Sequence, residues 1–167
     1  QMMEGLVSRK IRGFYIFGEN LANTEPDIHK VEHELAAAEI LVVQDIFLNE
    51  TTRFAHVVLP AAAWSENDGT FANSERRVSR VRTASPPPGE AKPNWWIFKQ
   101  IAKRFGQEWP SDSAKEIWDN EASVLAPQLC GIKYNRLEGN GLQWPCPDEE
   151  HPGTCFLHKD GNFTCGL

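Results

Sequence analysis

Two short polar loops hold the residues whose types could bind a nucleotide. The loops are Gly18-Glu19-Asn20 and Gln44-Asp45, and each directly follows a short apolar run. Glycine lets a ligand approach the backbone closely, and an aspartate carboxylate can accept two parallel N–H bonds from the edge of a guanine base. The alternative is that these polar residues only cap helices and face solvent at the rim of a sheet. Taken alone, the two loops leave that alternative open.

The apolar runs before these loops are typical of buried strands. Residues 13–17 and 40–43 are short and continuous, and residues 54–59 form a third run that stops at Pro60. With a helix between the first two, this pattern predicts the α/β class: a parallel-sheet, dinucleotide-binding-like layer with covering helices. Ligands of such sheets bind at the carboxyl ends of the strands, which is where both polar loops fall.

Helices are predicted at three places in the chain. Thr24 or Asp27 can cap the first, with Pro26 in its first turn and an end near Ala38. Asn94 is expected to cap the second, which runs to Phe105. The third opens on a capping-box spacing at Ser113 and runs to about Leu125.

Two segments are expected to be irregular. Residues 85–94 are rich in proline, which lacks a backbone donor, so an extended crossing segment is predicted there. From Gly139 onward glycine and proline dominate, and we expect an irregular C-terminal tail. This divides the chain into an α/β domain over 1–138 and a connecting segment over 139–167.

Composition limits the classes of partner. The chain has 167 residues and a formal net charge of −6, which argues against a general nucleic-acid binder. No apolar run approaches the roughly 20 residues that a spanning helix requires. We therefore expect a soluble, cytoplasmic protein with no membrane span and no nucleic-acid partner. The basic run Arg76–Arg82 could bind phosphates, or it could pair with acids such as Glu66, Asp68 and Glu75.

A metal site is the remaining chemistry that the residue types allow. Cys146, Cys155 and Cys165 have His151 and His158 between them, but closed zinc sites use tight Cys-x2-4-Cys pairs, which the chain lacks. We expect ordinary thiols in the tail. The glycine-rich phosphate-binding signatures and the nucleophile-elbow signature are absent as well, so no catalytic residue is predicted.

An ordered series of motifs resembles the formate dehydrogenase branch of the molybdopterin oxidoreductases. The resemblance covers nearly the whole chain, and His56 stands where that branch usually has Asp. The motifs are Gly18-Glu19-Asn20, Val43-Gln44-Asp45-Ile46-Phe47, Glu50-Thr51-Thr52, Val57-Val58-Leu59-Pro60, Trp64–Asn73, Glu75-Arg76-Arg77, Pro88–Trp96 and Leu142–Pro147.

The resemblance implies a role in holding a cofactor. Such enzymes bind molybdenum or tungsten between two molybdopterin guanine dinucleotides and interconvert formate and carbon dioxide. This chain resembles the third domain, which holds one dinucleotide, and Asp45 is the expected contact to guanine or ribose. The implied cofactor-binding residues are Gly18, Glu19, Asn20, Thr24, Gln44, Asp45, Asn67 and Asn94.

The same resemblance implies parts that this sequence does not contain. The metal-ligating Cys or selenocysteine and the segment for a 4Fe-4S cluster match nothing here, so this chain is expected to hold cofactor without turning over substrate. Its expected partners are the rest of the catalytic subunit and electron-transfer subunits. Two alternatives stay open: a related nitrate reductase-like or respiratory-complex subunit, and a non-catalytic nucleotide-binding module.

Overall fold

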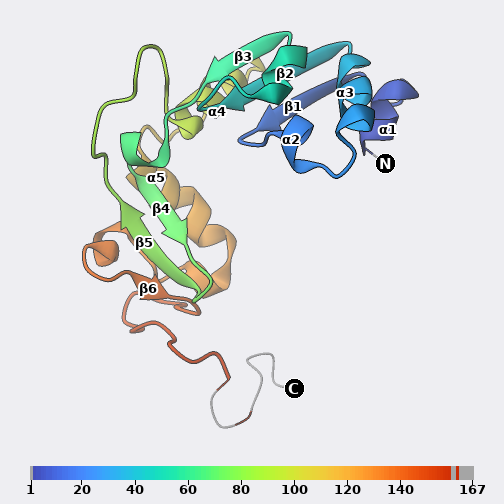
Figure 1. Cartoon of the computed structure of the whole chain (residues 1–167). Helices are drawn as coiled ribbons and strands as arrows, with labels where there is room; N and C mark the ends of the chain where they lie inside the picture. Colours follow the sequence, from blue (N-terminus) through green and yellow to red (C-terminus); the bar gives the residue numbers. More distant parts are fainter. Residues whose placement is uncertain (1, 159–160, 162–167) are drawn as a thin grey trace. The chain divides into compact units, whose positions relative to one another are not determined.

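The computed structural model describes residues 2–158 and 161, and it contains two compact units (Figure 1). The first unit consists of Gln1–Ala63 and Pro87–Phe98, and the second consists of Trp64–Pro86 and Lys99–Leu167. Each unit has its own sheet and its own buried cluster of apolar side chains. No helix within the described residues is both long enough and apolar enough to cross a membrane.

The first unit contains the predicted parallel sheet. Its strands β1 (Gly13–Phe17), β2 (Ile40–Asp45) and β3 (Val57–Pro60) lie in the order β1-β2-β3. Gly13 pairs with Ile40, and Val42 pairs with Val57. All three strands therefore end at the same edge of the sheet, as the α/β class requires.

Helices cover both faces of this sheet (Figure 1). The helices α1 (Met2–Val7), α2 (Leu21–Thr24) and α3 (Ile28–Ala36) pack on one face, around a core that includes Leu6, Ile16, Leu35, Leu41 and Val43. On the other face, Phe98 of α4 (Asn94–Arg104) contacts the rings of Tyr15 and Phe17. Tyr15 and Phe17 alternate with Ile16 along β1, which is why they point to the opposite face.

Three local predictions in the first unit need correction. Of the two predicted caps, Asp27 caps α3 by accepting a bond from Lys30 N, so Pro26 precedes the cap and does not lie in the first turn of the helix. The third strand begins at Val57, because η1 (Glu50–Phe54) is a 3-10 helix. His56 then ties the connection to β2, since its Nδ1 accepts the Leu41 N–H at 3.0 Å.

The third correction concerns the start of α4. Asn94 is the first residue of this helix and makes no capping bond with its side chain. The Pro93 carbonyl instead accepts the N–H groups of Trp96 and Ile97. The asparagine side chain is thereby left for a tertiary contact, which is described below. The preceding segment 85–93 forms no helix or strand, as predicted, but it is not extended throughout, because the chain turns at Gly89 and Glu90. Lys92 then pairs with Ala61 as an isolated bridge.

The second unit is built on a small antiparallel sheet. Its strands β4 (Gly69–Ala72), β5 (Arg77–Val81) and β6 (Leu142–Gln143) lie in the order β4-β5-β6, and the 3-10 helix η2 (Trp64–Glu66) precedes them. The buried cluster of this unit contains Val78, Ile132, Leu137 and Cys146. The expected irregular tail thus contributes a short strand and a core residue.

The helical segment after Ser113 changes type along its length. Ser113 caps α5 (Ala114–Ile117), as its capping-box spacing predicts, by accepting the Glu116 N–H. The segment continues as a π-helix η3 (Trp118–Ala122) and ends in the 3-10 turn η4 (Ser123–Leu125). Asp119 binds both Lys133 Nζ and Tyr134 N, and helical spacing cannot anticipate such tertiary bonds. The 3-10 turns η5 (Pro127–Leu129) and η6 (Tyr134–Leu137) follow.

Candidate functional site

The loops after β1 and β2 meet at the carboxyl ends of the strands. We call this region, residues 18–20 and 44–49, the carboxyl edge. The Gly18 N–H donates to the Gln44 carbonyl at 2.9 Å, which joins the first loop to the end of β2. Gln44 and Asp45 are the last two residues of this strand, and not the loop that the sequence predicts, because both pair with β3. Gly18 has a φ of +61°, a conformation that favours glycine, and a Cβ at this position would meet no atom within 4 Å. The backbone of the first loop therefore borders open space.

Asn20 fixes the first loop to the 3-10 helix η1. Its Oδ1 accepts both the N–H and the hydroxyl of Thr51, at 3.2 and 2.8 Å, and its Nδ2 donates to Glu50 at 2.6 Å. The bond from Asn20 lowers the pKa of Glu50 below its ordinary value. Thr51 is fully buried and also accepts the Ala22 N–H at 3.0 Å, so one hydroxyl connects α2, the loop and η1.

Glu19 and Thr24 form a separate and exposed pair in the same loop. The Thr24 hydroxyl is 2.8 Å from a carboxylate oxygen of Glu19 and 3.2 Å from the Asn20 carbonyl. These contacts close the loop onto α2. The backbone N–H groups of Glu19 and Asn20 have no hydrogen-bond partner among the described residues, so they can donate to a ligand.

A buried amide connects the end of β2 to α4. Gln44 is fully buried, its Oε1 accepts the Tyr15 hydroxyl, and its Nε2 donates to Asn94 Oδ1 at 2.8 Å. Burial raises the pKa of Tyr15, which keeps its hydroxyl protonated as a donor. Because Asn94 uses only its oxygen in this chain of bonds, its NH2 group has donor capacity left.

The carboxylate of Asp45 is oriented by its own loop. Oδ1 accepts the Ile46 N–H at 2.6 Å and lies 3.4 Å from Phe47 N, while Oδ2 accepts the Asn49 side chain at 2.8 Å. A carboxylate offers about four acceptor positions, so one on Oδ2 is free and the long Phe47 bond is easily exchanged. The next three residues, Ile46, Phe47 and Leu48, are exposed by 47, 72 and 82%. An apolar surface therefore borders this carboxylate.

The structure brings together seven of the eight predicted site residues in one unit. Gly18, Asn20, Gln44, Asp45 and Asn94 are linked through the bonds at the carboxyl edge, and Glu19 and Thr24 lie in the adjoining loop and helix. Asn67 belongs to the second unit, between η2 and β4.

Three residues that support the site have no predicted role. They are Tyr15, Glu50 and Thr51. Tyr15 reads as an ordinary strand residue, and its partner is 29 positions away in the chain. Glu50 and Thr51 belong to a motif that carries the family resemblance, which was the available signal. The pattern alone assigned them no partner.

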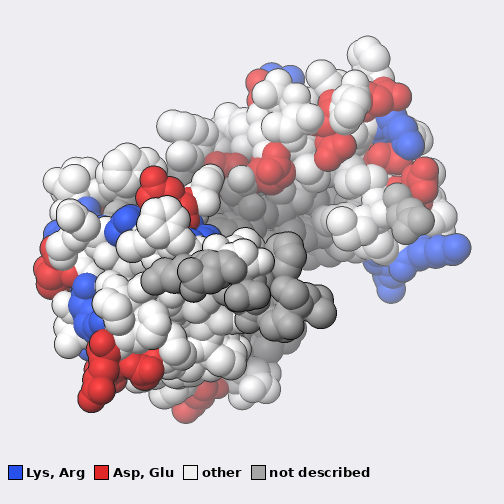
Figure 2. All heavy atoms as spheres, turned by 90° about the horizontal axis from the view of Figure 1, so that it is seen from below, with Lys and Arg blue, Asp and Glu red and all other residues white. Residues whose placement is uncertain are grey.

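The basic run Arg76–Arg82 is used inside the second unit. Arg76 donates to the carbonyls of Trp144, Thr154 and Cys155, and Arg80 and Arg82 both bind Glu138. On the face shown in Figure 2, Lys and Arg side chains lie in small groups among Asp and Glu. The interpretation in which this run pairs with nearby acids holds for Arg77, whose Nε lies 3.6 Å from the Glu75 carboxylate. The acid that binds Arg80 and Arg82, Glu138, was not among those considered, and neither were the carbonyls that bind Arg76.

The cysteines show no grouping suited to a metal in the part of the chain that is described. No set of three or more His, Cys, Asp or Glu side chains there could hold a metal ion. Cys146 is buried and its sulfur lies 3.3 Å from the His151 carbonyl, whereas Cys155 is exposed. Cys165 falls outside the described residues.

Comparison with known proteins defines the family. The profile described as molybdopterin oxidoreductase matches residues 1–104, more than half of the chain. This chain therefore belongs to the molybdopterin oxidoreductase family. Its fold resembles that of acetylene hydratase from Pelobacter acetylenicus, with a TM-score of 0.69 at 19% identity, over 84% of this chain and 20% of that one.

Relatives that resemble the chain more closely in sequence bear formate dehydrogenase names. It is 48% identical to the F420-dependent formate dehydrogenase subunit alpha of Methanocaldococcus jannaschii, over 93% of this chain and 23% of that protein. It is 47% identical to the F420-dependent formate dehydrogenase 2 subunit alpha of Methanococcus maripaludis, over 90% of this chain and 22% of that protein. The chain thus spans less than a quarter of the length of these relatives.

Proposed function

We propose that this chain is a segment of the catalytic subunit of a formate dehydrogenase-type molybdopterin oxidoreductase. Within it, the carboxyl edge of the β1-β2-β3 sheet binds the guanine dinucleotide part of a molybdopterin cofactor. The observation that carries the proposal is the junction of the first loop with the end of β2, in which Gly18 N–H binds the Gln44 carbonyl beside Asp45. A parallel sheet binds ligands at this edge because the loops diverge there and leave room.

The groups at this edge fit a guanine nucleotide. Asp45 has acceptor capacity for the N–H groups on the Watson–Crick edge of guanine, after exchange of its long contact to Phe47. The exposed apolar residues beside it supply a surface on which a purine ring can pack. This combination of an acidic acceptor and an apolar neighbour is suited to a base that has adjacent donors.

Donors for phosphate oxygens are also present. The N–H groups of Glu19 and Asn20 and the NH2 group of Asn94 point to a backbone and amide cradle at the first loop and at the start of α4. The open space at the Gly18 Cβ position allows phosphate to approach the chain there.

The role of these residues is to bind and orient. When bound, the cofactor and its molybdenum or tungsten supply the redox chemistry. Gln44, locked between Tyr15 and Asn94, fixes one side of the cradle, and Thr51 and Asn20 fix the other. Bonds of this kind hold a dinucleotide in one place, which is how a protein keeps a reactive centre at a constant distance from its substrate. We assign the metal ligand, the 4Fe-4S cluster and the contacts to electron-transfer subunits to other parts of the parent protein.

The test uses the full-length protein that contains this chain, purified as the assembled enzyme. Asp45→Asn is compared with Asp27→Asn, which removes the same charge from the same unit but keeps an α3 cap, since asparagine caps helices well. Guanine nucleotide released by acid is measured per mole of protein. A charge-assisted bidentate pair is worth about 1–3 kcal/mol, so Asp45→Asn should lower affinity for the guanine nucleotide roughly 5- to 150-fold and Asp27→Asn should leave it unchanged.

Two further measurements separate the alternatives. Formate oxidation and nitrate reduction by the same full-length preparation distinguish a formate dehydrogenase from a nitrate reductase-like sister. A full-length protein that contains no guanine nucleotide, or that releases adenine nucleotide instead, would contradict the guanine assignment to Asp45. Equal guanine content in the Asp45→Asn and Asp27→Asn proteins would place the base elsewhere.

A further inference from the structure

The side chain of Asn49 closes the loop that follows β2. Its NH2 group donates to Asp45 Oδ2 at 2.8 Å, and its Oδ1 accepts the Thr52 N–H at 3.2 Å as the cap of η1. The backbone N–H of Asn49 donates to the Phe47 carbonyl at 3.1 Å. One half-buried amide therefore joins the Asp45 carboxylate to the backbone of η1.

These two side-chain bonds fix which way the amide of Asn49 points. The NH2 end of an amide only donates, and its oxygen only accepts. A reversed amide would place its oxygen against the Asp45 carboxylate and its NH2 group against the Thr52 N–H, so both contacts would become repulsive. Asn49 therefore presents a donor to Asp45 in a single orientation.

The donor from Asn49 determines which acceptor positions of Asp45 remain for a ligand. The Ile46 N–H occupies one position on Oδ1 at 2.6 Å, and Asn49 occupies one position on Oδ2. Each oxygen keeps one further position once the 3.4 Å contact to Phe47 N is exchanged. Two acceptors side by side match the two adjacent N–H donors of a guanine base.

The same bond restrains the exposed apolar residues beside the carboxylate. Ile46, Phe47 and Leu48 lie between Asp45 and Asn49 in the chain, and the bond between these two side chains closes the loop that carries them. A loop that is already ordered loses less conformational entropy when a ligand binds. The carboxylate and the apolar surface are thus held together as one binding element.

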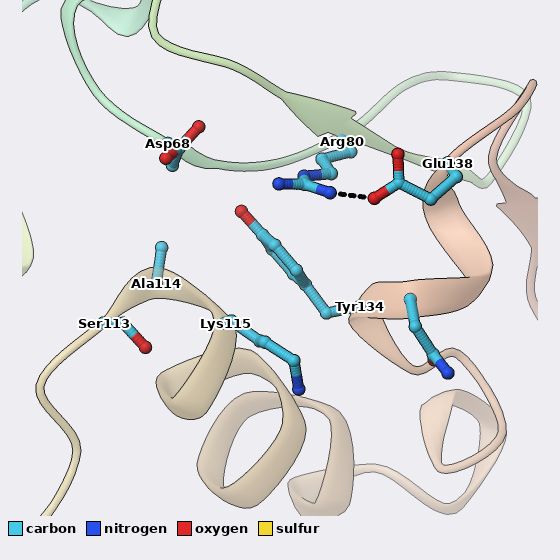
Figure 3. A pocket seen from close by; sticks show the side chains of 8 residues that line it. Asp68, Arg80, Ser113, Ala114, Lys115, Tyr134 and Glu138 are labelled. Carbon is cyan, nitrogen blue, oxygen red and sulfur yellow. Dashed lines mark hydrogen bonds and ion pairs between the residues drawn. The ribbon is translucent and has the colours of Figure 1, made fainter.

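The cavity of the second unit shows why this loop, and not every polar cluster, can serve a ligand. In that cavity, of about 250 Å³, Arg80 binds Glu138, and its guanidinium lies over the Tyr134 ring at 4.6 Å (Figure 3). The Tyr134 hydroxyl and the Arg80 Nε are buried in protein. The half-buried Asp45 carboxylate, by contrast, can be reached from solvent.

We propose that Asn49 is a positioning residue for guanine recognition at the carboxyl edge. It holds the Asp45 carboxylate so that one acceptor position of each oxygen faces the base. The inference rests on the proposed function, since it requires a guanine nucleotide at Asp45. A residue that only caps η1 would need the amide oxygen alone, whereas positioning Asp45 needs the NH2 group.

The test changes the donor and keeps the cap. Asn49→Asp retains an oxygen for the Thr52 N–H, because aspartate caps helices as well as asparagine does, and it places a second carboxylate against Asp45. The full-length assembled enzyme is held at about pH 8, and the loss of bound guanine nucleotide is followed over time. Release should be at least about 10-fold faster, because repulsion replaces a charge-assisted hydrogen bond. Asn120→Asp, at an exposed position of the second unit, should release at the wild-type rate.

A pH series separates positioning from capping. In Asn49→Asp, repulsion between the two carboxylates raises the pKa of the pair for binding one proton, so the proton is taken up as the pH falls toward about 5. That proton restores a donor to the Asp45 carboxylate, and release should slow toward the wild-type rate. The other charged groups at this loop, Glu50 and Arg53, are present in both proteins, so the wild-type series accounts for them.

Each remaining outcome overturns a stated claim. Fast release from Asn49→Asp at every pH would overturn the positioning role, and faster amide exchange of residues 50–54 would then identify loss of the cap as the cause. A wild-type release rate in Asn49→Asp, together with fast release from Asp45→Asn, would overturn this inference and leave the proposed function intact. A wild-type enzyme without guanine nucleotide would overturn both.

Discussion

The two units place their polar side chains in opposite ways. In the first unit, the Asp45 carboxylate, the Asn94 NH2 group and the backbone N–H groups of Glu19 and Asn20 lie near the ends of parallel strands and retain free hydrogen-bonding capacity. In the second unit, the arginines of β5 and its preceding turn are bound to carbonyls and carboxylates of their own unit, Arg76 and Arg80 among them. Strand direction explains the difference, because parallel strands bring several loops to one edge. The polar residues therefore form a candidate binding site in the first unit, whereas the arginines stabilise the fold of the second unit.

The largest loss of stability is expected at Gly131, where the backbone of the second unit is most closely packed against another segment. A Cβ on Gly131 would lie 1.8 Å from the Asp148 carbonyl oxygen, a backbone atom that cannot swing away. Gly131→Ala should destabilise this region by roughly 3 kcal/mol, since overpacking of a rigid contact costs that much or more. Amide hydrogen exchange of residues 128–132 and 146–148 in the full-length protein measures the local opening. Gly139→Ala, where a Cβ meets nothing within 4 Å, is the matched control and should leave exchange unchanged.

The next prediction tests whether the basic run Arg76–Arg82 stabilises the second unit. Arg76→Lys keeps the charge but loses the planar fork that reaches three carbonyls and the stacking on Trp144. We expect a loss of about 2–3 kcal/mol, seen as faster proteolysis and exchange over residues 144–155. Arg82→Lys changes an exposed ion pair and should have little effect, because surface pairs contribute less than about 1 kcal/mol. Equal sensitivity of both variants would show that Arg76 stabilises the second unit no more than an exposed ion pair does.

In the first unit, the sharpest test is the buried hydroxyl of Thr51. Thr51→Val leaves the Ala22 N–H without its acceptor and removes a donor to Asn20, so it should destabilise the loop by about 1–2 kcal/mol. Exchange of the Ala22 amide should accelerate, and guanine nucleotide content should fall with it. Thr70→Val on β4 is the control, where a β-branched residue suits the strand. A normal nucleotide content with a loosened loop would separate folding from binding.

The smallest expected effect is a change in how stability depends on pH in the acid range. Because the bond from Asn20 lowers the pKa of Glu50, the bond contributes stability that is present above the ordinary value of 4.5 and is lost as pH falls through the lowered value. Glu50→Gln should remove this loss from the acid limb of a stability profile. In the second unit, Arg82 and Arg80 lower the pKa of Glu138, and Glu138→Gln should act in the same direction. An acid limb identical in wild type and Glu50→Gln would contradict the contribution of Asn20.

Features that depend on residues close together in the sequence were predicted correctly, and features that depend on residues far apart were not. Strand β1 has the predicted bounds, and the caps at Asp27 and Ser113 lie at predicted positions, because propensity and capping act over a few residues. The Asn94 cap was wrong, since a bond to Gln44, 50 positions away, uses that side chain. Phe54, the last residue of η1, was predicted as the start of a strand, since an apolar run does not show the bonds that Asn49 and Thr51 make.

The sequence by itself determined the α/β class, the parallel strands and the polar loops at their ends, because hydrophobic runs and short loops encode these directly. Membership of the molybdopterin oxidoreductase family confirms the resemblance that the ordered motifs indicated. Only the tertiary structure decided which polar groups remain able to form hydrogen bonds with a ligand, as Asp45 does, and which already use their hydrogen bonds within the fold, as Arg76 does. The reason is physical: a side chain of one type binds a ligand or holds the fold according to the partners that distant parts of the chain bring to it.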